Sequence, residues 1–442
     1  MTRPHSRRRF LGFAGAAATT AALSACAGTG GGGASTETSA ATGGSGAGAP
    51  LQWWSNHPGQ SKELEQRIID AWTEQNPDVP VQLVDAGQDY EEVAQRFNAA
   101  LTGDQLPDMV VVSDVTWFNF ALNDNLTPLD DLWESEGVDA QDLVDTLRDD
   151  YLYEDRHFAM PYARSTNLMY LNDEVWEKAG LEKRGPSTWQ EFEEWAPRIR
   201  EALGDDRPAL VVPDGENYLD WYFQGMIWTF DGAYSEEWTP TFTKQQSIEA
   251  GEFLQRMVRA GHIQISPDPD NAFATGLAGS LLQSTGVLGG LRDTAVMDFT
   301  TAYLPGPPPG CATGGAGIAV PSGISDERKA QAVRFIDFVT STQNTITFTQ
   351  ATGYMPVRKS ALEDPGEQQY LDENPNARTA IEQLGENTAP QDYARVFVNG
   401  GGNRIGAGLD RITVGDEDVR TVFQALQDET QTVIERDITP NL

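Results

Sequence analysis

From residue 51 onward, short apolar runs alternate with segments in which apolar residues are spaced further apart. Short apolar runs predict strands, and the first three are at residues 51–54, 79–83 and 109–112. In the segments between them, apolar residues recur every three or four positions, which predicts helices over residues 61–76 and 90–103. This order of strand, helix, strand, helix and strand predicts an α/β sheet with right-handed crossovers.

The same alternation continues in the middle of the chain. Strands are expected at residues 157–162 and 168–171, separated by a polar interruption at residues 164–166. A further strand is predicted at residues 209–212, and helices are predicted at residues 172–180, 188–199, 248–258 and 330–339. The chain therefore alternates strands with helices over most of its length, as α/β proteins do.

A run of small residues at 314–317, Gly-Gly-Ala-Gly, leads into an apolar strand at residues 318–320. A dinucleotide-binding loop has the opposite context, because it follows a strand and opens a helix. We therefore reject a nucleotide-binding role for this run.

The most aromatic stretch of the chain, residues 217–230, holds six aromatic side chains in fourteen positions, against 9% over the whole chain. Aromatic faces suit the wall of a pocket that holds a small polar ligand by its C–H groups or by a cationic head. The spacing of Tyr218, Trp221 and Tyr222 is also typical of a helix packed in a core. The pattern alone leaves both interpretations open.

Asp114 follows the apolar run at residues 109–112. In open α/β sheets, ligands gather at the carboxyl ends of the strands, which makes Asp114 a candidate ligand contact. Asp114 could equally cap the helix that follows it. Residue pattern does not separate these two roles.

Composition and charge narrow the class of protein. The 442 residues, 39% of them hydrophobic, suffice for two domains of ordinary size. The formal net charge of −35 argues against nucleic acid and against electrostatic docking on anionic membranes, although a local pocket can still bind an anion. With two cysteines, Cys26 and Cys311, the chain is not a disulfide scaffold.

The first 50 residues have the composition of a targeting and tethering segment. Residues 1–25 contain Arg7-Arg8-Arg9 and an apolar, alanine-rich run, and they look like a twin-arginine export signal. Residues 23–26, Leu-Ser-Ala-Cys, look like a lipobox in which Cys26 is lipidated. Residues 26–50 are rich in Gly, Ser, Thr and Ala, which predicts a lipid-anchored flexible tether.

The chain resembles the extracellular solute-binding proteins of ATP-binding-cassette importers. More narrowly, it resembles the glycerol-3-phosphate and glycerophosphodiester (glycerophosphocholine) binding family over residues 51–436. The most specific motifs are TGYMPVRKS, NPNAR and QDYARVF in that order. The others are WWSNHPGQ at 53–60, DYEEVAQRFNAAL at 89–101, MPYARSTNLMYLN at 160–172, WYFQG at 221–225, STG at 284–286 and TGGAGIAVP at 313–321.

This resemblance implies a class II periplasmic-binding-protein-like fold, in which two α/β lobes are joined at a hinge and close over a central ligand cleft. We expect residues 51–161 and 305–356 to form lobe 1, and residues 162–304 and 357–442 to form lobe 2. The implied function is capture of glycerophosphocholine, related glycerophosphodiesters or sn-glycerol 3-phosphate, and delivery to a membrane permease. The protein is then an exported monomer, lipid-anchored to the outer face of the cytoplasmic membrane.

The resemblance also implies a ligand site. The positions that match the family's motifs are Tyr90, Asp114, Ser165, Tyr218, Trp221, Ser284, Gly315, Tyr354 and Arg395. Arg395 matches the arginine on the phosphoryl group, Trp221 an aromatic wall, and Tyr218 a position that we expect to vary among relatives. A guanidinium fork suits this task because it pairs with two phosphate oxygens at once and stays charged.

Two other classes of protein are also compatible with the sequence. One is an oligosaccharide-binding protein of the maltose type, which shares fold and location. The other is a secreted hydrolase, against which the absence of HExxH, GxSxG and Cys/His clusters counts. We expect no enzyme activity and no cofactor. We also expect no metal site, because the prolines around Asp268 and Asp270 favour a turn over a cation loop.

Overall fold

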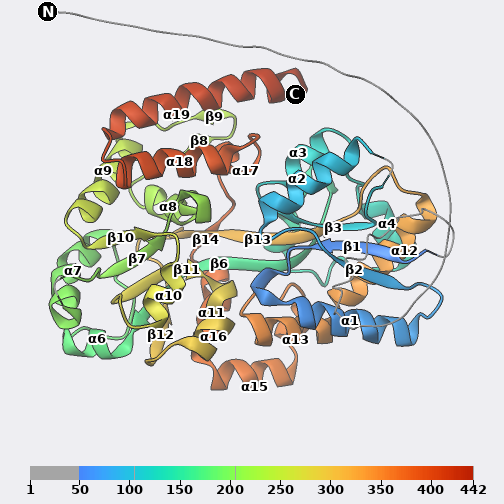
Figure 1. Cartoon of the computed structure of the whole chain (residues 1–442), viewed down its shortest axis with the longest axis horizontal. Coiled ribbons are helices and arrows are strands. Elements are labelled where there is room, and N and C mark those ends of the chain that lie inside the picture. Colours follow the sequence, from blue (N-terminus) through green and yellow to red (C-terminus); the bar gives the residue numbers. More distant parts are fainter. Residues whose placement is uncertain (1–48, 104, 205, 442) are drawn as a thin grey trace, which may run out of the picture. The chain divides into compact units, whose positions relative to one another are not determined.

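The computed structural model describes residues 49–441, apart from residues 104 and 205. The predicted lipidation site Cys26 and the export and tether segments before residue 49 lie outside the described residues. The main structure is one mixed sheet (Figure 1). Its strands, in spatial order, are β10 (Ile263–Ser266), β7 (Leu210–Pro213), β11 (Ser280–Ser284), β6 (Met160–Asn172), β13 (Cys311–Ala319), β3 (Met109–Ser113), β1 (Leu51–Ser55) and β2 (Val81–Asp85).

Shorter strands complete the β-structure. β12 (Phe299–Ala302) pairs with β6, and β14 (Thr388–Ala389) pairs with β13. Two separate ribbons are formed by β4 (Leu152–Tyr153) with β5 (Arg156–His157), and by β8 (Ser235–Glu236) with β9 (Thr239–Pro240).

The first half of the sheet follows the predicted order of strand and helix. β1 pairs in parallel with both β2 and β3, and all five residues of β3 are buried, as expected for a parallel strand covered on both faces. The β2 strand begins two residues later than the predicted 79–83. The helices of this half are α1 (Lys62–Gln75), α2 (Tyr90–Leu101), α3 (Trp117–Leu122), α4 (Asp130–Glu136), α5 (Asp145–Asp149), α12 (Asp326–Val339) and α13 (Thr342–Thr352). Helix α14 (Lys359–Leu362) packs against α13.

The central strand β6 is longer than the sequence predicts. All of its thirteen residues are buried, and it continues through residues 164–166, so the predicted polar interruption is wrong. Its first half pairs with β13 and its second half with β11 and β12. Two of these polar side chains find buried partners, since Oγ1 of Thr166 accepts from the amide of Gln383 and Arg164 pairs with Asp150, as described below. β6 and β13 therefore belong to both halves of the sheet, which is the expected arrangement of hinge strands.

The small residues at 314–317 lie inside β13, not before it. Gly315 has φ 98°, a conformation that favours glycine, and it marks a shift of register against β6. A Cβ atom there would lie 2.1 Å from the carbonyl oxygen of Ala163. The glycine is thus required by the close approach of the two hinge strands.

The second half of the sheet carries most of the remaining helices. Its core includes α8 (Leu219–Trp228), in which every residue from 219 to 227 is buried. Tyr218 precedes this helix as its N-cap with φ 72°, in the left-handed region, so it lies outside the helix that carries Trp221. The other helices are α6 (Asp173–Lys178), α7 (Trp189–Leu203), α9 (Gln245–Arg259), α10 (Pro269–Ala274), α11 (Leu288–Thr294), α15 (Pro365–Glu373), α16 (Pro375–Glu386), α17 (Tyr393–Val396), α18 (Gly401–Thr413) and α19 (Val419–Val433).

The two halves have separate hydrophobic cores, which defines an α/β protein of two lobes, as predicted. A further cluster joins the C-terminal part of the chain to the first half, because Ile434 and Ile438 pack in the same cluster as Phe97 and Trp117. None of the helices in the described part of the chain is long and apolar enough to cross a membrane.

Candidate functional site

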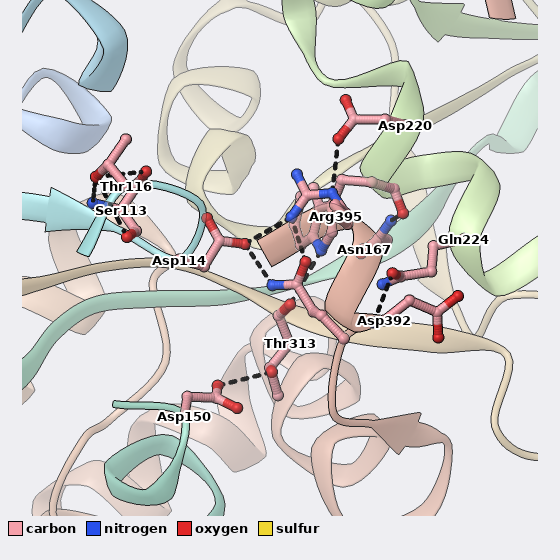
Figure 2. A network of polar contacts seen from close by, with 12 residues as sticks. Ser113, Asp114, Thr116, Asp150, Asn167, Asp220, Gln224, Thr313, Asp392 and Arg395 are labelled. Carbon is pink, nitrogen blue, oxygen red and sulfur yellow. Dashed lines mark hydrogen bonds and ion pairs between the residues drawn. The ribbon is translucent and has the colours of Figure 1, made fainter. Parts of the chain in front are cut away.

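Side chains from three distant segments meet around Arg395 (Figure 2). Arg395 lies on the short helix α17 and is 2% exposed. Asp114 follows β3 in the first half of the sheet, and Asp220 is the second residue of α8 in the other half. The fold therefore brings together, between the two halves, residues that the sequence keeps far apart.

The guanidinium of Arg395 makes two ion pairs. Its Nε donates to Oδ2 of Asp220 at 2.6 Å, and its Nη1 donates to Oδ2 of Asp114 at 2.9 Å. Nη1 also contacts Oε1 of Gln391, whose own amide donates to Asp114. Nη2 has no hydrogen-bond partner among the residues that the structure describes. One edge of the guanidinium is thus held by protein, and a donor is left over.

Burial and charge act in opposite directions in this cluster. Burial raises the pKa of Asp220, and the adjacent Arg395 opposes that rise. Burial alone would lower the pKa of Arg395, but Asp220 and Asp114 raise it above its ordinary value. The guanidinium therefore stays charged although the Arg395 side chain is almost fully buried.

Helix α17 is itself held in place by buried hydrogen bonds. Asp392, at its start, accepts from the backbone N–H of Tyr234 at 2.7 Å and from Nε1 of Trp228 at 3.2 Å. Its own N–H donates to Oε1 of Gln224 at 3.0 Å. Burial raises the pKa of Asp392 to about 6. These contacts fix the position from which Arg395 extends.

A second buried ion pair lies on the hinge strands. Nη2 of Arg164, on β6, contacts Oδ2 of Asp150, and Nη1 donates to the hydroxyl of Tyr151 at 2.8 Å. Asp150 also accepts from Oγ1 of Thr313 on β13 at 2.7 Å, so the pair joins both hinge strands. Burial raises the pKa of Asp150, and Arg164 opposes that rise.

The predicted site residues Asp114 and Gly315 are in direct contact, since the N–H of Asp114 donates to the carbonyl of Gly315 at 3.0 Å. Ser165 is 2% exposed on β6, where it pairs with Gly314. Ser284 ends β11 and its Oγ accepts from the N–H of Gly286 at 3.1 Å, so one of its roles is to cap the following turn.

Tyr90 and Tyr354 come together from opposite ends of the sequence. Their hydroxyls are 3.5 Å apart, and Tyr354 stacks on Phe348. Gly286 lies against the ring of Tyr354, where a Cβ would approach Cζ to 2.6 Å. Burial raises the pKa of both tyrosines, so both hydroxyls are neutral at physiological pH.

The predicted aromatic wall is largely part of the core. Trp221 is 6% exposed, and its Nε1 donates to the carbonyl of Thr313 at 3.0 Å. Its ring covers Gly314, where a Cβ would approach Cζ2 to 2.4 Å. Tyr218 is less buried than Trp221. Burial raises the pKa of Tyr218, and nearby carboxylates, that of Glu91 first among them, raise it further. Trp221 therefore packs against hinge strand β13.

Sequence reasoning missed several residues of this network. Asp220 was hidden in the aromatic stretch, although a lone carboxylate in an apolar helix is a signal of a buried charged partner. Gln391 belongs to the same motif as Arg395. Arg164 stood out only as a polar residue in an apolar segment, and Asp150 is one of several acidic residues between positions 145 and 155.

A polar cavity of about 380 Å³ opens beside the network. Gly402 at its edge lies close to Asp220, since a Cβ there would approach Oδ2 to 3.0 Å. The cavity is lined by residues of α2, of α3 and of the start of α18, among them Glu91, Asn98, Asn119, Asn399 and Asn403. In the described part of the chain, no group of three or more His, Cys, Asp or Glu residues is placed to hold a metal ion.

Comparison with known proteins defines the class. The model of the bacterial extracellular solute-binding protein family matches residues 67–379, and the chain belongs to this family. Curated relatives include the sn-glycerol-3-phosphate-binding periplasmic proteins UgpB of Salmonella paratyphi A and of Escherichia coli K12. They are 24% and 23% identical over 407 and 409 residues, covering 87% of this chain and 91% of each relative.

Solved structures extend this similarity. UgpB from Mycobacterium tuberculosis in complex with glycerophosphocholine is 46% identical, with a TM-score of 0.86, covering 88% of this chain and all of that one. The acarbose-binding GacH receptor of Streptomyces glaucescens is 18% identical, with a TM-score of 0.75, over 87% of this chain and 98% of that one. The predicted class II periplasmic-binding-protein-like fold is confirmed.

Proposed function

We propose that this protein is the solute-binding subunit of an ATP-binding-cassette importer and that it captures glycerophosphodiesters, glycerophosphocholine among them. The observation that carries the proposal is the buried guanidinium of Arg395 between the two lobes, with Nη2 free of partners in the described part of the chain. A guanidinium binds phosphate oxygens in a fixed geometry and keeps its charge.

The other predicted residues supply the remaining chemistry. Asp114 and the hydroxyls of Tyr90 and Tyr354 orient the glycerol hydroxyls, and Ser165, Ser284 and Gly315 add contacts to the ligand oxygens. Tyr218 and Trp221 face the trimethylammonium head, which cannot donate hydrogen bonds and is held best by aromatic faces.

The comparisons favour a diester. The 46% identical protein of M. tuberculosis was solved with glycerophosphocholine, whereas the relatives named for sn-glycerol 3-phosphate are 23–24% identical. The sugar-binding neighbours at 18% support the fold alone. The solute-binding family and the absence of hydrolase motifs in the sequence favour binding over catalysis.

Calorimetry with glycerophosphocholine, glycerol 3-phosphate and maltose tests the proposal on the purified chain lacking residues 1–25. We expect saturable binding of glycerophosphocholine, no binding of maltose and no turnover of any of the three. Saturable binding of maltose without phosphate dependence would assign the protein to the oligosaccharide binders, and turnover would make it an enzyme.

The cellular setting is part of the same proposal. The pattern of residues 1–26 supports export by the twin-arginine route and lipid anchoring at Cys26, with residues 26–50 as a tether. The protein acts as a monomer that closes on its ligand and is then read by the permease. Residues 51–161 and 305–356 form one lobe, and residues 162–304 and 357–442 form the other.

A further inference from the structure

Asp220 is the one charged residue in helix α8, whose sequence is LDWYFQGMIW, and it is 1% exposed. Helix α18 packs over it at Gly402, where a Cβ would approach Oδ2 to 3.0 Å. A carboxylate so enclosed is costly unless a cation compensates it. Its cation is Arg395, whose Nε donates to Oδ2 of Asp220 at 2.6 Å.

This contact fixes the orientation of the guanidinium. Because the guanidinium is planar, holding Nε at Asp220 and Nη1 at Asp114 defines the directions of all its N–H groups. The donor that stays without a partner among the described side chains is Nη2. A phosphate that binds Arg395 therefore meets Nη2 first.

The ion pair between Asp220 and Arg395 also determines the charge of the site. Two carboxylates, Asp114 and Asp220, surround one guanidinium, which leaves one net negative charge. The neighbouring guanidinium of Arg164 does not change this balance, because it is paired with Asp150. A phosphodiester carries one negative charge, whereas a phosphomonoester carries close to two above pH 7. The second charge of a monoester would be repelled by the carboxylates.

We propose that Asp220 is a positioning and charge-selecting residue, which aims Arg395 at the ligand and makes the site select singly charged phosphodiesters over doubly charged phosphomonoesters. The inference rests on the proposed function, because it assigns the substrate charge of that same site. The inference differs from the proposed function in two respects. It concerns Asp220, and the quantity it predicts is the ratio of the affinities for two ligands.

The test uses two ligands that differ by one methyl group, glycerol 3-phosphate and its methyl ester, titrated by calorimetry at pH 8. In the unchanged protein, the methyl ester should bind at least roughly tenfold more tightly than the monoester, given one extra like charge a few ångströms from a carboxylate. In Asp220→Asn this ratio should fall by roughly tenfold, even if both affinities decline because Arg395 is less well held.

Two variants serve as controls. Asp220→Glu keeps the charge and should keep the ratio while weakening both ligands through altered geometry. Glu367→Gln removes another buried carboxylate, one that accepts from Gln350 at 2.7 Å, and should change neither the ratio nor the affinities. If Asp220→Asn does not fold, as judged by circular dichroism, Asp220→Ser is used, with the same shift expected.

An unchanged ratio in the folded Asp220 variant, with both affinities altered by one common factor, would show a purely structural role and overturn the inference. A wild-type preference for the monoester would overturn it as well. If the wild-type protein binds neither ligand nor glycerophosphocholine, the proposed function itself is wrong, which is a different result from the other two.

Discussion

The carboxylate of Asp114 accepts a hydrogen bond from Nη1 of Arg395 at 2.9 Å, although 281 positions separate the two residues. Asp114 follows a strand of the first lobe, and Arg395 is anchored to the second through Asp220. The ion pair is therefore a direct contact between the lobes at the site where the ligand is proposed to bind. A phosphate that reaches Arg395 competes with Asp114 for its donors.

Arg395→Ala should weaken glycerophosphocholine binding and the fold together. Loss of the guanidinium removes the partner of a desolvated phosphate, which costs about 2–5 kcal/mol, or roughly 30-fold to several thousandfold in affinity. It also leaves Asp220 buried without a cation, which costs about 3–5 kcal/mol of the free energy of unfolding. Calorimetry and urea denaturation measure the two effects.

Arg334→Ala is the matched control for this prediction. Its guanidinium is 51% exposed and pairs with Glu136 at 3.4 Å on the surface, where such pairs contribute about 0–1 kcal/mol. Affinity of Arg395→Ala within twofold of the wild type would remove Arg395 from the ligand site.

Gly315→Ala should destabilise the hinge. At φ 98° an alanine is strained, and its Cβ would lie 2.1 Å from the carbonyl oxygen of Ala163. The strain alone costs about 1–3 kcal/mol, and the clash adds to it. The carbonyl of Gly315 also accepts from the N–H of Asp114, so affinity for glycerophosphocholine should fall too.

Gly290→Ala is the control for Gly315→Ala. Gly290 lies in α11, and a Cβ there would meet no atom within 4 Å. An alanine in a helix is favoured over glycine by about 0.5–1 kcal/mol. The melting temperature should therefore fall for Gly315→Ala and stay level or rise for Gly290→Ala. Equal melting temperatures for the two variants would show that the hinge tolerates a side chain at Gly315.

Sequence pattern predicted the fold well where burial alone decides the structure. The apolar run at residues 109–112 became β3, and the helices after β1 and β2 formed at the predicted positions. The prediction failed at residues 164–166, because period and polarity do not reveal that Arg164 finds its partner in Asp150. A buried polar residue is compatible with a strand when a distant side chain satisfies it.

The residues of the candidate site also divide into those that the sequence could predict and those that it could not. Asp114 and Arg395 could be selected from motif position, and the structure brings them into contact. Asp220 could not be selected, since its ion pair spans 175 positions and its neighbours in sequence look like an ordinary core helix. The sequence left two roles open for Trp221, a ligand wall and core packing. Its hydrogen bond to the carbonyl of Thr313 shows that packing is one of them.

Asp392 should make stability depend on pH between about 4 and 6. Burial raises its pKa to about 6 in the folded protein, above the ordinary value of 3.8. Because the unfolded chain then releases the proton first, the stability contributed by this group is fully present below about pH 4 and is lost as pH rises through 6. The difference between these two pKa values corresponds to roughly 2–3 kcal/mol.

Asp392→Asn removes this titration. Relative to the wild type, the variant should gain roughly 2–3 kcal/mol in the free energy of unfolding between pH 4 and pH 7, measured by denaturant titration at both values. Asp326→Asn, at a fully exposed carboxylate, serves as the control and should show no such change. A constant difference between Asp392→Asn and the wild type across this range would contradict the assignment.

Cys26→Ala should release the full-length protein from the membrane. Cys26 is the residue that the lipobox pattern marks for acylation, and two or more acyl chains give stable anchoring. The variant should appear in the soluble fraction after cell fractionation, with unchanged affinity for glycerophosphocholine, because all the candidate ligand contacts lie at residue 90 or later in the sequence. Retention in the membrane fraction after a high-salt wash would refute the anchor.

Trp221 should contribute to stability through the hinge and to affinity through the head group. Its Nε1 donates to the carbonyl of Thr313 at 3.0 Å, and its ring covers Gly314. Truncation to alanine should therefore cost about 3–5 kcal/mol of the free energy of unfolding, as for other buried aromatic residues. Trp221→Phe keeps an aromatic face and loses the N–H, so it should be less destabilising.

The contribution to binding is measured with two diesters of equal charge, glycerophosphocholine and the methyl ester of glycerol 3-phosphate. Only the first has a quaternary ammonium head, for which one aromatic face contributes roughly 0.5–2 kcal/mol. Trp221→Ala should therefore weaken glycerophosphocholine by roughly two- to thirtyfold more than it weakens the methyl ester, and Trp221→Phe should largely preserve the difference. Equal losses for both diesters would mean that Trp221 acts through the hinge alone, and the trimethylammonium head would then be left to Tyr218.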